Sequence, residues 1–353
     1  MRKMRFTLKM MAALMVCGLL AGCAAQQGAA PEDTTGGSAA SSDTAATPEG
    51  NALAGPEATP DENEAGTEAA EKLKIICTLF PQYDFARSIA GDEAEVTMLL
   101  SPGQEAHMFD PTPSDMEAIA SCDLFIYTGD SMEGWAAQIV ESLDDEVQVL
   151  DLSQYVTLRE EDDHDHEGHE GHDHDHGGYD PHYWLDMTNA MAMASAIGDT
   201  LADLDESHAG DYQARTDAYV QQLSDLDAAF MDTVDSSPRK DIVFGGRFAY
   251  SYFIARYGLE YESVYHSCSA EADPSVSDMI RVIDYIREHQ NTCIFYEELA
   301  SGNVAETIAG DVHITTAVFS TGHNVTKSEF DSGITFIELM NRNLTLLKEA
   351  LAQ

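Results

Sequence analysis

The stretch LKIICTLFPQYDFARSIAGDEAEVTMLLS, residues 73–101, sets the pattern for the folded part of the chain. LKIICTLF is a continuous apolar run with β-branched residues, which predicts a buried strand. PQYDFARSIAGD predicts a helix that ends at Gly91, and EVTMLLS predicts a second strand. Short apolar strands that alternate with helices predict βα units and a parallel sheet covered on both faces.

The same alternation continues to residue 153 and returns after residue 240. Residues 187–236 interrupt it with apolar positions at helical spacing, which predicts a short helix and then a long one over about residues 209–235. We therefore expect an α/β fold of two lobes, each a parallel sheet with flanking helices, joined by a long helix. Ligands of open parallel sheets bind beyond the carboxyl ends of the strands, so the cleft between the lobes is the expected site. The expected divisions are an N-terminal lobe over 73–186, linking helices over 187–237 and a C-terminal lobe over 238–353.

The N-terminus has the features of an export signal. Basic residues precede a short apolar run and the tetrapeptide LAGC, residues 20–23. A membrane helix is the alternative, but about a dozen apolar residues are too few to span a bilayer. We expect a signal peptide over 1–22, a lipid on Cys23 and a disordered polar tether over 23–72, which would anchor the protein outside the cytoplasm.

The formal net charge is −45. Such a charge argues against nucleic acid or anionic lipid headgroups as partners and suits a protein that attracts cations, although acidity that merely aids solubility explains it equally well. The cysteines of the folded part lack CxxC spacing and lie in or beside apolar runs, so buried thiols are expected rather than a zinc site. These cysteines are Cys77, Cys122, Cys268 and Cys293, and the sequence does not assign disulfide bonds among them.

Three histidines lie where an α/β cleft would place a site. His107 follows the strand EVTMLLS, His182 lies in DPHYWLD between the two lobes, and His323 follows the strand HITTAVFSTG. A single histidine at such a place is more often an ordinary core or loop residue. Three imidazoles around one ion form a zinc-type ligand set, so together they suggest a metal site.

The segments PGQEAHMFDPTPSDM and DPHYWLD, the long helix between two lobes, and the C-terminal CIFYEELASGNVAETIA and FIELMNRNLTLLKEAL carry a family resemblance. From about Lys74 to its C-terminus the chain resembles the substrate-binding lipoproteins of bacterial zinc and manganese ABC importers (ZnuA/TroA type, cluster A-I). The resemblance implies Zn²⁺ as the ligand, with Mn²⁺ as the alternative, an ABC permease as the partner, and no enzymatic activity. It also implies that His107 and His182 are the metal ligands of the first lobe.

The chain departs from the family pattern in the second lobe. The usual third ligand falls on Arg247, which stays protonated and repels a cation, and the usual fourth falls near Ser320. Either metal binding is lost or different residues supply the ligands, and His323 is the expected substitute. Arg247 would then need a buried carboxylate as its partner, and Glu271 and Glu297 are the candidates. Arg247 and these two glutamates are also the residues that could contribute to the metal site, either as additional ligands or by holding a ligand in place.

A histidine-rich stretch precedes DPHYWLD. Histidine alternates there with Asp, Glu and Gly and gives no apolar face, so residues 160–178 are expected to be disordered and to bind metal only weakly. Two roles follow: His182 belongs to the tight site, and six residues collect or sense metal, namely His164, His166, His169, His172, His174 and His176.

The preferred function is therefore a monomeric, lipid-anchored protein that captures Zn²⁺ for an ABC importer. A zinc hydrolase would need a general base and a nucleophile, but Glu105 is the only acid beside the first ligand and no nucleophile motif is present. The chain could also be a manganese-binding homologue or a metal-dependent adhesin. Carboxylate-rich sites suit manganese better than histidines do, and no feature of the sequence is specific to adhesion.

Overall fold

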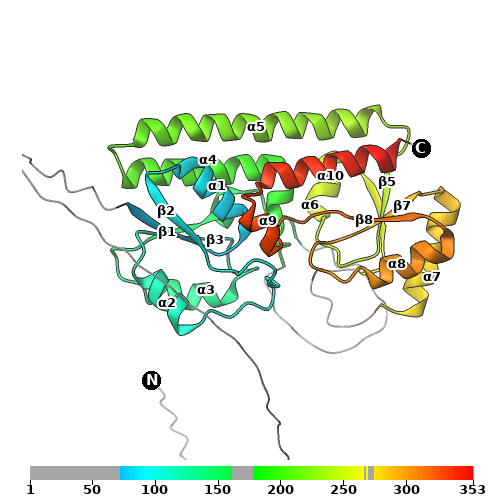
Figure 1. The fold of residues 1–353 in the computed structure, drawn as a ribbon, viewed down its shortest axis with the longest axis horizontal. Helices are drawn as coiled ribbons and strands as arrows, with labels where there is room; N and C mark the ends of the chain where they lie inside the picture. Colours follow the sequence, from blue (N-terminus) through cyan, green and yellow to red (C-terminus); the bar gives the residue numbers. More distant parts are fainter. Residues whose placement is uncertain (1–71, 161–177, 266–267, 269–273, 353) are drawn as a thin grey trace, which may run out of the picture. The chain divides into compact units, whose positions relative to one another are not determined.

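The computed structural model describes residues 72–160, 178–265, 268 and 274–352, all within the compact unit Thr67–Gln353. Among these residues, eight strands form two sheets, and every paired strand is parallel (Figure 1). The first sheet has the order β2-β1-β3-β4, with β1 (Leu73–Cys77), β2 (Ala94–Met98), β3 (Leu124–Tyr127) and β4 (Gln148–Asp151). The second repeats this arrangement as β6-β5-β7-β8, with β5 (Asp241–Phe244), β6 (Glu260–Ser263), β7 (Cys293–Tyr296) and β8 (Thr315–Val318).

Helices connect the strands and link the two sheets. The first lobe has α1 (Phe80–Ala90), α2 (Pro113–Ala120) and α3 (Gly134–Val140), and the second has α6 (Ser251–Tyr257), α7 (Val276–His289), α8 (Asn303–Val312), α9 (Lys327–Asp331) and α10 (Phe336–Leu351). Between them run α4 (Met187–Leu204) and α5 (Ala209–Ser236). Because α5 contacts α1 and α4 as well as α6 and α10, this one helix runs beside both lobes (Figure 1). The predicted fold of two α/β lobes joined by a long helix is confirmed.

Side-chain alternation along the strands gives each sheet two buried faces. On β1, Ile75 and Cys77 enter the main core, which also contains side chains of α1, α4, α5 and α10, whereas Ile76 enters a second cluster with α2 and α3. In the other lobe, Phe244 joins the main core and Val243 packs into a third cluster with α7 and α8. Helices therefore cover both faces of each sheet, as continuous apolar strands require.

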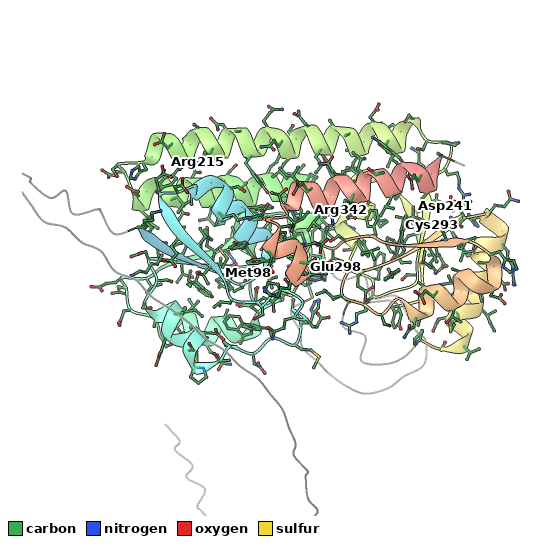
Figure 2. All side chains as sticks on the ribbon, in the orientation of Figure 1. Met98, Arg215, Asp241, Cys293, Glu298 and Arg342 are labelled. Carbon is green, nitrogen blue, oxygen red and sulfur yellow. The ribbon has the colours of Figure 1, made fainter. Side chains whose placement is uncertain are left out.

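The predicted end of α1 at Gly91 is confirmed, and its cause is visible. Gly91 has a φ of 60°, which lies in the region that favours glycine. Arg215 of α5, labelled in Figure 2, donates from Nε to the Ile89 carbonyl at 2.5 Å and from Nη2 to the Ala90 carbonyl at 2.9 Å. A cation from the linking helix thus satisfies the last carbonyls of α1 and fixes α5 against the first lobe.

The strands are shorter than predicted, and several short elements were not predicted. The apolar run over 313–322 forms a strand only at Thr315–Val318, so residues 319–323 leave the sheet as a loop. The five-residue α9 and the 3₁₀ turns Leu152–Tyr155 and Tyr183–Leu185 are additional. Within the described part of the chain, no helix has the length and apolar character needed to cross a membrane.

Candidate metal site

The loop after β2 carries His107 and is held by the loop after β8. Asn324 donates from Nδ2 to the carbonyls of Ser101 and Gln104 at 2.8 and 2.9 Å, and Gly103 N–H donates to the Val325 carbonyl at 2.8 Å. These contacts join residues more than 200 positions apart and place the end of β2 against the end of β8. The backbone that carries His107 is therefore positioned by the segment that carries His323.

His182 is fully buried at the start of the 3₁₀ turn Tyr183–Leu185. Its Nδ1 lies 2.6 Å from Asp180 Oδ1, and its main-chain N–H donates to the same oxygen at 2.9 Å. A carboxylate accepts from Nδ1–H, so Nε2 carries the lone pair. The next residues fix the turn from both sides: Tyr183 OH donates to the Thr128 carbonyl, and Trp184 Nε1 donates to the Thr321 carbonyl, each at 2.7 Å.

His323 lies five residues beyond the end of β8. Its carbonyl accepts from Phe80 N–H at 3.2 Å, so the backbone of His323 is tied to the first turn of α1. Its Nδ1 lies 2.5 Å from Thr321 Oγ1. That contact turns Nε2 toward the other histidines.

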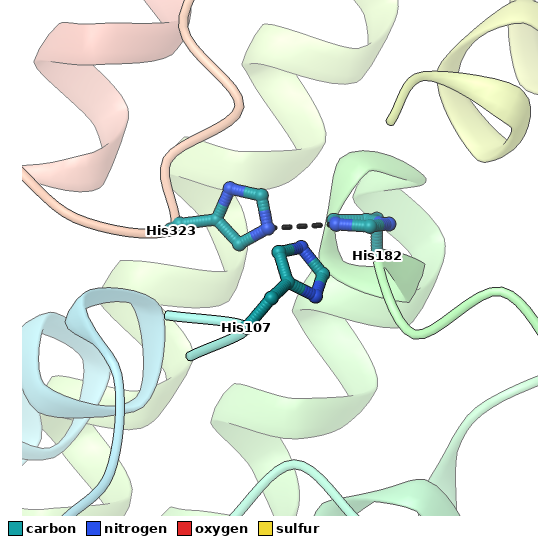
Figure 3. Close-up of side chains that lie close together, drawn as sticks. All are labelled: His107, His182 and His323. Carbon is teal, nitrogen blue, oxygen red and sulfur yellow. Dashed lines mark hydrogen bonds between the residues drawn. The ribbon is translucent and has the colours of Figure 1, made fainter. Parts of the chain in front are cut away.

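The structure brings His107, His182 and His323 together. One nitrogen from each ring lies within 4.8 Å of the other two, and Figure 3 shows the three rings gathered from separate segments. The Nε2 atoms of His182 and His323 are 2.7 Å apart, and His107 Nε2 is buried without a hydrogen-bond partner. Two lone pairs at that distance repel unless a proton or a metal ion lies between them. Tetrahedral zinc, with Zn–N bonds of about 2.0–2.1 Å, would separate them by about 3.3 Å.

Electrostatics keep the site in the form that a metal requires. Burial, with a smaller effect from the charge on His182, lowers the pKa of His107 to about 4. Burial and the other two histidines lower the pKa of His323 well below its usual value. Burial alone would raise the pKa of Asp180, but the charge and hydrogen bonds of His182, together with Ser251, bring it below its usual value. At neutral pH His107 and His323 are therefore neutral donors, and an anionic carboxylate stands behind His182.

Arg247 pairs with a carboxylate that the sequence did not suggest. Its guanidinium Nη1 lies 2.8 Å from Glu105 Oε2, and both side chains are about 40% exposed. Glu297 accepts from main-chain N–H groups, including that of Arg247, and its Oε2 is buried without a partner. The sequence suggested a carboxylate from the second lobe, but the long side chain reaches the loop of the first lobe instead. Glu271, the other candidate, lies outside the described residues.

Ser320, at the usual fourth-ligand position, has a structural role. Its main-chain N–H donates to Asn343 Oδ1 at 2.8 Å, and its carbonyl accepts from Asn343 Nδ2 at 2.7 Å. Its hydroxyl accepts from Gly322 N–H at 3.1 Å. These bonds attach the loop to α10, so this serine shapes the turn that presents His323.

A small cavity of about 30 Å³ adjoins the imidazoles, with room for a guest the size of one or two water molecules. Its lining includes His107, His323, Arg247, Glu297 and Glu298. A larger open cavity of about 410 Å³ lies on the side of β5 and β7 and shares Glu105, Arg247 and both glutamates with it. Glu105 and Arg247 therefore line both the larger cavity and the small one beside His107 and His323.

The residues that hold the three histidines were not predicted, although a simple pattern marks them. Each histidine has a polar residue two positions before it, in the segments EAH, DPH and TGH. In each case that side chain accepts from the main-chain N–H of the histidine, at 3.2, 2.9 and 3.4 Å for His107, His182 and His323. Asp and Thr commonly bond the backbone two residues on, so this spacing could have identified Asp180 and Thr321.

Several predicted features cannot be compared with the structure. Cys23 and the six histidines from His164 to His176 lie outside the described residues. Residues 160 and 178, at the ends of the stretch expected to be disordered, are described, and Glu160 forms an isolated antiparallel bridge with Tyr179. Cys77 and Cys122 are buried free thiols, as the sequence predicts, but Cys268 and Cys293 are only partly buried, so the prediction is wrong for their burial.

Comparison with known proteins agrees with this fold. The model of the family described as "Zinc-uptake complex component A periplasmic" matches residues 75–350. The high-affinity zinc uptake system protein ZnuA of Bacillus subtilis is 30% identical over 283 residues, which are 80% of this chain and 88% of that protein. The zinc-binding lipoprotein AdcA of Streptococcus pneumoniae is 29% identical over 292 residues, 81% of this chain but 57% of AdcA, so the chain spans little more than half of that relative. The crystal structure of the Zn(II)-bound ZnuA-like domain of AdcA superimposes with a TM-score of 0.67 at 26% identity, covering 80% of this chain and 100% of that domain.

Proposed function

The chain belongs to the family of zinc-uptake complex component A, and from this premise we propose that it captures Zn²⁺ and delivers it to the permease of an ABC importer. The cluster of three imidazoles carries this proposal. His107, His182 and His323 come from three segments, their ligand atoms lie within 4.8 Å of one another, and His182 is held by a carboxylate on its outer nitrogen. That is the donor set of a zinc site with one position left open.

Zinc is favoured over manganese by the donor atoms. Among the described residues, the group that could hold an ion contains three nitrogen ligands and no carboxylate. Imidazole suits zinc, whereas manganese prefers sites rich in oxygen ligands. The relatives ZnuA and AdcA are also named for zinc, which supports the same choice.

We assign the fourth coordination position to Glu297 or to a water molecule. Glu297 lines the small cavity together with His107 and His323, and burial raises its pKa to about 7. Its Oε2 has no hydrogen-bond partner in the described structure, so a cation would satisfy it. Glu271 stays a second candidate. Arg247 is no ligand, because its guanidinium is engaged by Glu105 and remains protonated.

We propose that the mature protein is a monomer tethered to the outer face of a membrane. A signal peptide over 1–22, lipid on Cys23 and a polar tether over 23–72 would keep the two lobes near a permease, and the name of the relative AdcA includes the word lipoprotein. The N-terminal lobe would then span 73–186, the linking helices 187–237 and the C-terminal lobe 238–353. Replacing Cys23 with Ser should release the protein from the membrane fraction of cells and leave zinc binding unchanged.

Competition with a chelating dye tests the metal site. Purified protein without an affinity tag should bind one zinc ion tightly, and His107→Ala, His182→Ala and His323→Ala should each weaken that binding by on the order of tenfold or more. His289→Ala is the matched control, since His289 stacks on Tyr285 far from the cluster in sequence and is not part of it. A wild-type protein without a tight zinc site, or three mutants that bind like the control, would overturn the proposal.

A further inference from the structure

A chain of hydrogen bonds stands behind His323 and ends on a carboxylate. Thr321 Oγ1 lies 2.5 Å from His323 Nδ1 and donates to Glu298 Oε1 at 2.6 Å. The main-chain N–H of Thr321 donates to the other oxygen, Oε2, also at 2.6 Å. Glu298 comes from the loop after β7, and Figure 2 labels it between the two lobes. The loops after β7 and β8 therefore meet at one hydroxyl that is almost completely buried.

The single proton of that hydroxyl gives the chain a direction. An ionised carboxylate only accepts, so beside ionised Glu298 the Thr321 Oγ1–H points to Glu298, and the hydroxyl oxygen is left to accept. The acceptor faces His323 Nδ1, which must then carry the ring proton. In that tautomer His323 Nε2 has its lone pair free, and Nε2 is the atom that faces His182 at 2.7 Å.

The opposite direction would disable the ligand. If Thr321 donated to His323 Nδ1, Nε2 would carry the proton and could not bind a cation without losing it. His182 is held in the same tautomer without a hydroxyl in between, because Asp180 accepts directly from its Nδ1 at 2.6 Å. Two different arrangements thus prepare the two Nε2 atoms that face each other.

We propose that Glu298 is a positioning residue of the metal site, which acts through the Thr321 hydroxyl to hold His323 in the tautomer and orientation that bind zinc. This inference rests on the proposed function and adds to it two residues that never touch the ion. Glu298 also accepts from the backbone of the loop, so a purely structural role is the competing explanation. The experiment must separate the hydroxyl relay from the support of the loop.

Substitutions of Thr321 make that separation. Thr321→Val keeps the branched shape and the main-chain bond to Glu298 but removes the hydroxyl, and with it the relay and the 3.4 Å bond accepted from His323 N–H, whereas Thr321→Ser keeps both. Glu298→Gln keeps one acceptor for the two Thr321 donors, because its NH2 group cannot accept, and it leaves every hydroxyl in place; this variant also provides a test if the valine variant folds poorly. Thr326 and Glu329 offer a matched control, because Thr326 Oγ1 donates to Glu329 Oε2 at 2.8 Å in the same loop region without touching an imidazole.

Zinc affinity is measured by chelator competition on the full chain, with melting temperature recorded for each variant. Thr321→Val and Glu298→Gln should each weaken zinc by about 10- to 100-fold, as replacements behind a metal ligand do. Thr321→Ser should bind close to wild type, and the double variant Glu298→Gln with Thr321→Val should lose no more than the larger single loss, because both break one relay. Thr326→Val and Glu329→Gln should leave zinc affinity unchanged.

Three results would count against the relay in distinct ways. If Thr321→Val and Glu298→Gln bind zinc like wild type, or lose no more than the control pair, Glu298 supports only the loop and the inference is wrong. The same conclusion follows if Thr321→Ser loses as much zinc affinity as Thr321→Val. If wild-type protein has no tight zinc site, the proposed function fails, and this inference fails with it.

Discussion

Acidification is the most direct probe of the histidine cluster, because imidazole must be neutral to bind a metal. A histidine with the ordinary pKa of about 6.5 would be only about 3% neutral at pH 5. The pKa of His107 is lowered to about 4, so this residue stays about 90% neutral at that pH, by the same relation. The pKa of His323 is lowered as well. Protons therefore compete poorly with zinc at His107 until the pH approaches 4, and at His323 they compete less well than at an ordinary histidine.

We expect half of the tightly bound zinc to be released between about pH 4 and 5, well below the ordinary histidine range. The protein lacking residues 162–177 should be used, so that metal on the histidine-rich stretch does not obscure the tight site. Samples are dialysed in steps from about pH 7 to about pH 3.5, a range that brackets both the ordinary and the lowered histidine pKa, and retained zinc is measured by mass spectrometry. Circular dichroism at each step verifies that release precedes unfolding.

Half-release near pH 6.5 with the fold intact would refute this reasoning, because it would mean that the imidazoles titrate as exposed groups with a pKa of about 6.5. The full-length chain gives an internal comparison. Zinc on the histidine-rich stretch should leave near about pH 6, where ordinary histidines become protonated, and the tight ion should leave in a second step. A single step in the full chain would contradict two separate metal-binding roles.

Three further predictions concern other parts of the chain. Deleting residues 162–177 should lower the number of zinc ions bound per chain in calorimetric titration and leave one tight site. Loss of that tight site would contradict separate metal-binding roles for the histidine-rich stretch and His182. Glu105→Gln, which breaks the pair with Arg247, should change zinc binding by no more than about 0.2–1 kcal/mol, since the side chains are 42% and 37% exposed, and the difference should shrink in high salt. Burial raises the pKa of Glu133 to about 7, so its protonated form stabilises the fold at low pH and that contribution is lost as the pH rises through about 7. Glu133→Gln should therefore make the melting temperature of metal-free protein less dependent on pH between about 5.5 and 8, and an unchanged dependence in calorimetry would count against it.

Periodicity and apolar runs predict the elements of this fold well, because the central strands β1, β3, β5 and β7 are largely buried and read as apolar segments. They overestimate strand length for the same reason. The run over 313–322 stays largely apolar or small after the ladder ends at Val318, since residues 319–322 leave the sheet and still pack into the protein. The short helix Lys327–Asp331 has a local signal that was overlooked, the capping box formed by Thr326 and Glu329.

The sequence identifies the three histidines of the site, because they lie after strands or in the segment between the lobes. Parallel topology places His107 and His323 beyond the carboxyl ends of strands, one in each lobe, and the expected cleft between the lobes is where they meet His182. The partner of Arg247 did not follow, because Glu105 belongs to the other lobe and no local pattern shows which loops meet across a cleft. The relay from Glu298 was hidden for the same reason: it joins residues 23 positions apart that only the parallel pairing of β7 with β8 brings together.

The bridge between Glu160 and Tyr179 affects how the segment between these two residues can vary in evolution. The chain leaves and returns at one fixed point, where Tyr252 OH accepts from Arg159 N–H at 2.8 Å and donates to the Asp180 carbonyl at 2.9 Å. Lengthening a connection between two fixed ends costs little, about 0.6 kcal/mol for each doubling of its length. The number of histidines between residues 161 and 177 is therefore free to grow or shrink across generations, or at an engineer's bench, with little cost to the fold that holds His182.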